Sequence, residues 1–384
     1  MTRIGAGLSR LRATDEAVAE AVASVRAGLA GAEPDLVCLF LSAEHAESAA
    51  ATLHAVHAAL APRHLIGCVA EGIVGGDREL EQGPALSLWA ASLPEDAEIE
   101  TFHAVAYSGD EGIAVTGFPE LHEPDLVAVC VDFTTFPATP FVERLNELTP
   151  ELPLVGGIAA GGPPGRQTLL IDDRVVHEGL VGVTLRDVPV RTVVSQGCAP
   201  IGREAVVTAA EDNIVYELAG EPALDRLRVD VESLSPELQA LALEGLMVGL
   251  VIDENKAEYG RGDYLIRGLV GADEETGAIA VGAEVRVGQT LRFHVRDARS
   301  ADEDLLHALG ASLNGERAAG ALLFTCNGRG TGMFGEPHHD ARAVTRALET
   351  PALAGFFCGG EIGPVGGRAF VHGFTATLAV FLDS

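Results

Sequence analysis

The sequence predicts a mixed fold, between α/β and α+β, in which strand–helix–strand–strand units repeat and mixed sheets are covered by helices. Apolar runs of strand length alternate with segments of helical periodicity, and glycine-rich turns follow these runs at similar spacing. Strands also return after short connections, which argues against a purely parallel sheet. The 384 residues, of which 47% are hydrophobic, are enough for two domains of ordinary size.

The first element expected is an amphipathic helix. Alanine, valine and leucine recur at helical spacing from Asp15 to Leu29. We expect no signal peptide, because charges are spread through this region and it lacks an apolar core. The predicted domains are an N-terminal helix or extension (1–30), an N-terminal domain (31–215) and a C-terminal domain (216–384), the last two quasi-symmetric.

Three segments share one order of elements, namely an apolar run, a helix, a glycine-rich turn and a returning strand. They cover residues 36–91, 126–185 and 321–381. Such regular spacing favours internal repeats over the loose self-similarity of a glycine-rich chain. A fourth, degenerate copy is expected within 246–295. The glycines that align between the three copies are Gly67, Gly156 and Gly355, and then Gly72, Gly161 and Gly360.

Several strings carry a resemblance to a known family. The third copy contains Cys-Asn-Gly-Arg-Gly, Phe-Phe-Cys-Gly-Gly-Glu-Ile-Gly-Pro and His-Gly-Phe-Thr, and Gln-Gly-Cys-x-Pro-Ile-Gly precedes the C-terminal half. The sequence from about Asp35 to Leu382 resembles the FIST family. This resemblance implies a sensory module that binds a small ligand, with amino acids or related metabolites as the suggested class. It also implies a separate signalling output protein as partner.

Composition limits the other functions. A formal net charge of -30 disfavours binding to nucleic acid and to anionic membranes, and no apolar run is long enough to span a bilayer. The six cysteines include no CxxC pair, so we expect neither a disulfide framework nor a metal site. Cys38 and Cys130 lie in strand-like runs, which suggests core positions. We expect a cytoplasmic protein that binds no metal and no cofactor.

The candidate ligand site consists of polar residues on glycine turns in the third copy. Arg329 could grip a carboxylate, although a surface arginine that caps a helix fits equally well. Glu361 could receive an ammonium group or pair with Arg329, and His372 could bind ligand or a buried carbonyl. Asp340 is expected to cap a helix. The predicted site comprises Cys326, Asn327, Gly328, Arg329, Gly330, Cys358, Gly359, Gly360, Glu361 and His372, with Gln196 and Cys198 closing one side.

Two other classes of function remain open. Cys326 or Cys358 could serve as a nucleophile if Arg329 lowered its pKa, with His372 and Glu361 beside it. No nucleophile signature surrounds either cysteine, so we expect a binding protein and not an enzyme. A ligand-free adaptor or scaffold is the remaining alternative.

Overall fold

The computed structural model describes residues 2–109, 112–162 and 166–383. The mixed α/β fold class predicted from the sequence is confirmed. The chain forms two compact units, the first from residues 1–194 and 305–384 and the second from residues 195–304. The second unit is therefore inserted into the third copy. The boundaries at 31–215 and 216–384 remain a prediction.

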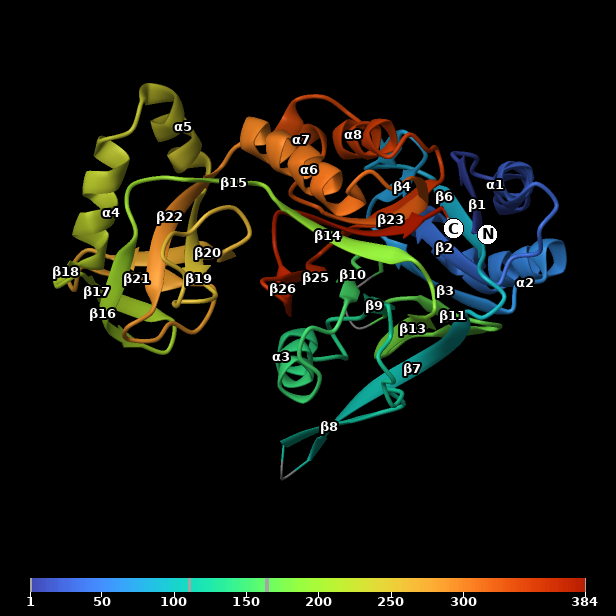
Figure 1. The fold of residues 1–384 in the computed structure, drawn as a ribbon, viewed down its shortest axis with the longest axis horizontal. Coiled ribbons are helices and arrows are strands. Elements are labelled where there is room, and N and C mark those ends of the chain that lie inside the picture. The colour runs from blue at the N-terminus through green and yellow to red at the C-terminus, as the bar shows by residue number, and fades with distance from the viewer. Residues whose placement is uncertain (1, 110–111, 163–165, 384) are drawn as a thin grey trace. The chain divides into compact units, whose positions relative to one another are not determined.

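The first copy is a strand–helix–strand unit followed by a hairpin and a returning strand (Figure 1). Its elements are β1 (Arg3–Ser9), α1 (Thr14–Leu29), β2 (Leu36–Ser42), the 3₁₀ helix η1 (Ala43–Ser48), α2 (Ala49–Leu60), β3 (His64–Ala70), β4 (Ile73–Gly75), β5 (Arg78–Leu80) and β6 (Leu86–Ser92). Helix α1 was predicted, but strand β1 was not. Gly5 and Gly7 let α1 pack directly on the backbone of this strand, because a Cβ at Gly5 would lie 2.2 Å from the Val25 carbonyl oxygen.

The other two segments follow a similar order, except that the second has strand β8 and no helix where the first has α1. The second copy contains β7 (Glu98–Gly109), β8 (Gly112–Thr116), β9 (Leu126–Val131), α3 (Ala138–Leu148), β10 (Leu154–Ile158), β11 (Leu169–Ile171), β12 (Arg174–Val176) and β13 (Leu180–Arg186). The third contains β14 (Val190–Gln196), α6 (Ala298–Leu313), β23 (Ala318–Cys326), α7 (Thr331–Phe334), α8 (His339–Ala347), β24 (Leu353–Cys358), β25 (Glu361–Val365), β26 (Arg368–His372) and β27 (Thr375–Leu382). The three sheets share one order of strands, which supports the predicted internal repeats.

Each sheet is completed by a hairpin from another copy. The first sheet has the order β1-β6-β2-β3-β11-β12, so its last two strands come from the second copy. The second sheet ends in β25 and β26 of the third copy, and the third sheet ends in β4 and β5 of the first copy. The three hairpins are therefore exchanged in a closed cycle. In every sheet the donated hairpin pairs antiparallel with the second strand of the parallel pair.

The aligned glycines allow the two parallel strands to approach. A Cβ at Gly67, Gly156 or Gly355 would lie 1.9, 2.0 or 1.8 Å from a carbonyl oxygen of the neighbouring strand. These oxygens belong to Leu39, Val129 and Leu323, which occupy the same register position in β2, β9 and β23. The glycine pattern seen in the sequence therefore reflects one backbone contact made three times.

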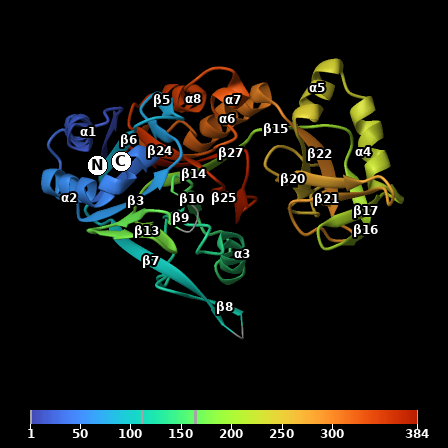
Figure 2. The ribbon, with the colours of Figure 1, turned by 180° about the vertical axis from the view of Figure 1, so that it is seen from behind.

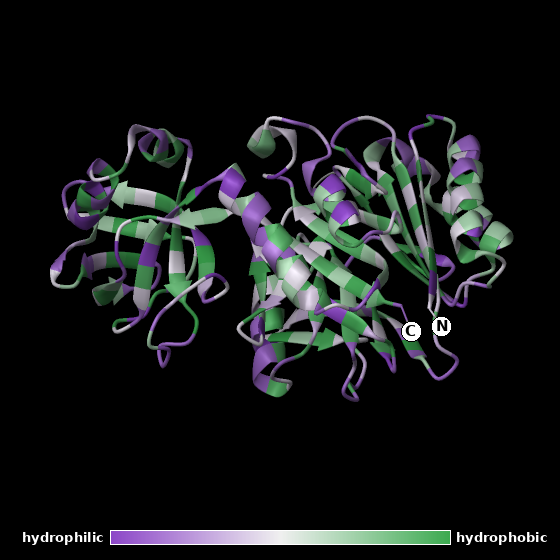
Figure 3. Cartoon of the chain, turned by 45° about the horizontal axis from the view of Figure 1, so that its top comes forward, coloured by the Kyte–Doolittle hydropathy of each residue, from purple (hydrophilic) through white to green (hydrophobic). Residues whose placement is uncertain are grey.

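Helices cover the outer faces of the sheets. Helices α1 and α2 pack on the first sheet, α3 on the second, and α6 and α8 on the third (Figures 1 and 2). The strands of the first unit are mostly hydrophobic along their length, whereas its helices alternate between hydrophobic and hydrophilic residues (Figure 3). Residues of all three sheets share one central core, which contains Cys38 and Cys130 as predicted.

The second unit consists of antiparallel strands with two helices. Its elements are β15 (Cys198–Pro200), β16 (Ala205–Glu211), β17 (Ile214–Leu218), β18 (Glu221–Pro222), α4 (Ala223–Glu232), α5 (Pro236–Glu244), β19 (Leu246–Val251), β20 (Tyr264–Asp273), β21 (Ala278–Val281) and β22 (Thr290–Arg296). Strand β19 pairs with both β20 and β22, so the sheet closes on itself. The prediction of a fourth copy within 246–295 is wrong, because the strands described there pair antiparallel and lack the parallel pair of the other copies.

We expect Gly355→Ala to destabilise the protein by about 1–3 kcal/mol, because the new methyl group collides with the Leu323 carbonyl and the parallel strands must separate. Gly310→Ala is the control, since this glycine lies in α6 with nothing within 4 Å of an added Cβ. The control should be neutral or stabilising by up to about 1 kcal/mol. Urea denaturation measures both variants, and equal stability of the two would contradict the prediction.

Candidate functional site

The two glycine turns of the third copy leave neighbouring strands of one sheet. Strands β23 and β24 are parallel, and Cys326 lies directly opposite Cys358 at their carboxyl ends. The Asn327 N–H donates to the Cys358 carbonyl at 3.0 Å, which holds the two turns together. Ligands of open α/β sheets bind outside the carboxyl ends of parallel strands. The adjacency expected from the sequence is therefore present.

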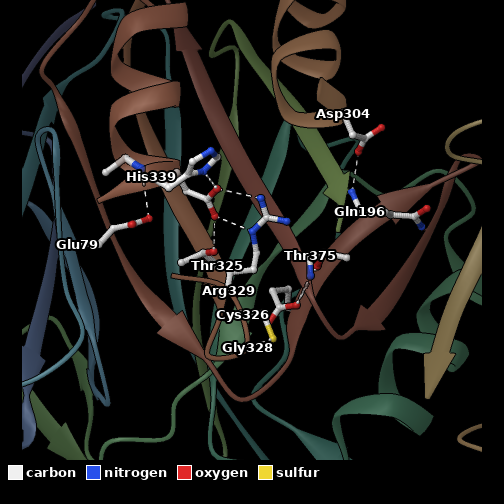
Figure 4. Close-up of polar contacts among 12 residues, drawn as sticks. Glu79, Gln196, Asp304, Thr325, Cys326, Gly328, Arg329, His339 and Thr375 are labelled. Carbon is white, nitrogen blue, oxygen red and sulfur yellow. Dashed lines mark hydrogen bonds and ion pairs between the residues drawn. The ribbon is translucent and has the colours of Figure 1, made fainter. Parts of the chain in front are cut away.

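Arg329 is buried in an ion pair with Asp340 (Figure 4). Its Nε and Nη2 donate to the two carboxylate oxygens at 2.6 and 2.9 Å, and Thr325 Oγ1 donates to one of these oxygens at 3.0 Å. Burial alone would raise the pKa of Asp340, but the charge and hydrogen bonds of Arg329 bring it well below its usual range. Neither a capping arginine on the surface nor a pair between Arg329 and Glu361 is observed.

The prediction that Asp340 caps a helix is wrong, because Asp340 lies inside the first turn of α8. His338 holds the cap position, and no side chain caps this helix. The Asp340 carboxylate binds Arg329 instead. A buried guanidinium without a countercharge costs more free energy than a helix terminus without a capping side chain. His339 Nδ1 lies 3.1 Å from Asp340 Oδ1, and the His339 ring stacks on the Phe334 ring with their centroids 3.5 Å apart.

A second buried carboxyl reaches this cluster from the first copy. Glu79 lies on β5, in the hairpin donated to the third sheet, and its Oε1 accepts the Ala341 N–H at 3.2 Å (Figure 4). Burial, followed by the nearby charge of Asp340, raises the pKa of Glu79 to about 8. The hairpin exchange thus supplies a side chain that no comparison of local sequence could have placed here.

Cys326 carries a protonated thiol in a structural position. Burial and the neighbouring Glu361 raise its pKa to about 12, so little thiolate forms at neutral pH. Its Sγ accepts the Gly328 N–H at 3.3 Å. At the equivalent strand end of the first copy, the Ser42 Oγ accepts the Ala85 N–H at 2.9 Å. A side chain that receives main-chain N–H groups is therefore a shared feature of these strand ends.

Glu361 is fully buried, and its carboxyl is bonded mainly through one oxygen. Its Oε2 accepts the Thr375 N–H at 3.0 Å and the Thr375 hydroxyl at 2.9 Å. No N–H or O–H group donates to its Oε1 in the described part of the chain, but the Cys326 thiol forms a side-chain hydrogen bond with the carboxyl. Burial, the largest effect, raises the pKa of Glu361 to about 8. His372 lies directly opposite Glu361, and its Nε2 lies 2.9 Å from the Gly363 carbonyl oxygen.

The equivalent pair is apolar in both other copies. The residues that pair at this register position are Ile73 with Leu80 in the first copy's hairpin and Leu169 with Val176 in the second copy's hairpin. The fold therefore does not require polar side chains at Glu361 and His372. The sequence singled out both residues, but this comparison depends on strand register and could not be made from the sequence.

Several polar donors of the two turns are already used within the protein. The Thr331 N–H and hydroxyl both donate to Glu81 Oε1, at 2.9 and 2.6 Å. The Gly359 N–H donates to the Ile158 carbonyl at 3.0 Å. The Asn327 side chain donates to Glu71 at 2.8 Å. A carboxylate of the protein itself, that of Glu81, thus occupies the place beside Gly330 where a ligand anion was expected.

Gln196 and Cys198 belong to the second unit. The Gln196 N–H donates to Asp304 Oδ2 and its side-chain amide donates to the Tyr264 carbonyl, both at 2.7 Å. Cys198 pairs with Arg296 at the start of β15. Their expected contribution to the ligand site remains a prediction.

Clusters of metal-binding side chains and membrane-spanning helices are both absent from the described residues. Within residues 2–109, 112–162 and 166–383, no group of three or more histidine, cysteine, aspartate or glutamate side chains is arranged to hold a metal ion. Over the same residues, no helix has both the length and the apolar character needed to cross a membrane.

We expect Asp340→Asn to destabilise the protein by about 3–5 kcal/mol, because it leaves the buried Arg329 without a countercharge. Glu147→Gln removes one partner of an exposed ion pair with Arg144 and is the matched control. Its effect should lie within about 1 kcal/mol. Chemical denaturation compares the two variants, and a small loss in Asp340→Asn would show that Arg329 is compensated by another group.

The free energy of unfolding should fall as the pH rises from about 4.5 to 8. Glu361 is protonated in the folded state up to a pKa of about 8, whereas an unfolded glutamate ionises near pH ~4.3. Folding therefore takes up a proton within this window, and the stability that the carboxyl contributes below it is lost as the pH rises. Glu361→Gln should flatten the decline and Glu147→Gln should not. An equal slope in both variants, measured by denaturation at several pH values, would contradict the assignment.

Comparison with known proteins places these features in a family. Residues 35–221 match the FIST N domain and residues 223–364 match the FIST C domain. The "Uncharacterized protein Rv0628c" of Mycobacterium tuberculosis (strain ATCC 25618 / H37Rv) is 46% identical over 391 residues, which is 99% of this chain and 100% of that protein. The "Uncharacterized protein Mb0898c" of Mycobacterium bovis (strain ATCC BAA-935 / AF2122/97) is 44% identical over 386 residues, 99% of each chain. The resemblance seen in the sequence is confirmed, and this chain belongs to the FIST family.

Proposed function

We propose that this protein binds a small molecule at the carboxyl ends of β23 and β24 and acts as a sensor in signal transduction. FIST domains are sensory domains of signal transduction. The observation that carries the proposal is the buried pair of Glu361 and His372, because both other copies have apolar pairs at this register position. Burying polar groups costs free energy, so polarity confined to one copy is better explained by function than by folding.

The atoms of this cluster that lack a hydrogen-bond partner support a ligand. Among the described residues, Glu79 Oε2 and Arg329 Nη1 are both buried without a hydrogen-bond partner. Such groups are uncommon in native proteins, and a bound molecule can satisfy them. Cys326 is only partly buried and Asn327 is exposed, so the cluster lies near the surface at this strand end.

The proposal also includes the ligand class, the compartment and the signalling partner that were expected from the sequence. The ligand is an amino-acid-like metabolite, the protein works in the cytoplasm, and a separate signalling protein receives the signal. The net charge of -30 supports a function without nucleic acid or anionic membranes. Catalysis by a cysteine receives no support from Cys326, since its thiol stays protonated at neutral pH.

The double variant Glu361→Leu/His372→Val tests the site, because it installs the apolar pair that the second copy has in Leu169 and Val176. We expect the folded state to be retained with a loss of stability of about 1–3 kcal/mol, because the apolar pair leaves the buried Thr375 N–H without its acceptor. Thermal shifts caused by amino acids and related metabolites should disappear in this variant.

The matched control is Ile73→Leu/Leu80→Val, which installs the same two residues in the first copy's hairpin. It should keep every ligand-induced shift of the wild type. Shifts that persist in the Glu361→Leu/His372→Val protein would move the site elsewhere. If no compound of the collection shifts the wild type, the ligand-free adaptor becomes the better description.

A further inference from the structure

The second sheet ends in a strand with a free edge, away from the ligand site. Strand β8 is the last strand of this sheet and, among the described residues, it pairs only with β7. Strand β13 pairs with β7 as far as Ala104, so the two-stranded ribbon of β7 and β8 continues beyond the rest of the sheet (Figure 1). A ribbon of two strands is marginally stable in water by itself, and a further strand would stabilise it.

The direction of the backbone groups in β7 follows from its neighbours. The Asp125 N–H donates to the Leu185 carbonyl, so β13 directs the polar groups of its odd-numbered residues to β9 and those of its even-numbered residues to β7. The register pairs even-numbered residues of β13 with even-numbered residues of β7. The odd-numbered residues of β7 therefore direct their N–H and C=O groups to β8.

The same alternation identifies the polar groups at the free edge of β8. Tyr107 lies opposite Ala114, so Ala114 forms its hydrogen bonds with β7. The residues on either side of Ala114 point the other way. The N–H and C=O groups of Ile113 and Val115 are therefore directed to the free edge.

The side chains of β8 are uncharged and partly apolar. Ile113 is 54% exposed, whereas Val115 packs with Ala106 and Phe118 against the core beneath α3. Natural proteins protect free edges with lysine, proline or inward-pointing charges, and Gly112–Thr116 contains none of these. An edge without charge favours a neutral partner strand over a charged peptide.

We propose that β8 pairs antiparallel with β8 of a second copy of this chain, about a two-fold axis at Ala114. In this register Ile113 lies opposite Val115 of the second copy, and the two residues exchange both of their hydrogen bonds. The axis generates the same pair once more. All outward N–H and C=O groups of Ile113 and Val115 are then satisfied in both copies.

The second copy fits this edge in its side chains and in its charge. Ile113 of one copy meets Val115 of the other on one face of the joined sheet, which extends the apolar cluster that contains Ala106. Two chains with a net charge of -30 repel each other, and an uncharged segment is where they approach at least cost. A pair of short strands buries little area, so the dimer is weak and is strengthened by salt that screens the repulsion.

Sedimentation equilibrium of the full chain from about 1 μM to about 1 mM, at low and at high salt, measures the dimer. We expect a monomer–dimer equilibrium that tightens with salt and does not proceed to larger species, because a two-fold pair is closed. Ala114→Glu should raise the dissociation constant roughly fivefold or more, since it places two carboxylates opposite each other at the axis. Ala114 is exposed in the single chain, so this variant should fold. The matched control is Ala51→Glu at an exposed alanine of α2, which should leave the dissociation constant unchanged.

A mixture of two variants tests the two-fold axis itself. Equal amounts of Ala114→Glu and Ala114→Arg should associate more tightly than either variant alone, because opposite charges then face each other. Far-ultraviolet circular dichroism checks that each variant is folded. Unchanged association of Ala114→Glu would overturn the inference, and so would a mixture that associates no better than its components. A wild-type chain that stays monomeric at about 1 mM also contradicts it and would leave the edge to a strand of another protein.

Discussion

The closed exchange of hairpins is the constraint on which the first unit depends. No copy completes its own sheet, because the hairpin on one side of each parallel pair comes from another copy. Donated strands cap the edges at which the parallel pairs would otherwise end, and they join three sheets around one core. The same exchange brings Glu79 of the first copy to Arg329 and Asp340 of the third. The exchange of hairpins therefore determines both how the three sheets are joined and which side chains surround Arg329.

Three copies of one fold also serve as internal controls for each other. Features shared by the copies, such as Gly67, Gly156 and Gly355 against a neighbouring carbonyl, are explained by packing. A feature found in one copy alone is not explained by the packing that all three copies share. By this criterion the partly buried Cys326 is structural, since Ser42 has a similar role, whereas Glu361 and His372 stand apart from their apolar counterparts.

Local patterns in the sequence predicted the fold class and the adjacency of the turns after Cys326 and Cys358, because periodicity and glycine spacing act over short distances along the chain. The strand β1, the hairpin exchange and the insertion of residues 195–304 depend on contacts between distant segments and gave no local signal. The pairing of Arg329 with Asp340 was missed for another reason. Asp340 fits a helix cap by its position, and only burial shows why it binds the guanidinium instead.

The exchange of hairpins also bears on how the chain folds as the ribosome releases it. The first sheet has all of its strands once residue 176 has emerged, but the second must wait for β25 and β26, which end at His372. Until then the edge of β10 stays unpaired, and the early hairpin of β4 and β5 has no sheet to join. Contacts of such long sequence separation are slow to form and leave strand edges exposed to other chains. A nascent chain stalled before its last strands is thus expected to associate with its neighbours, whatever the stability of the finished protein.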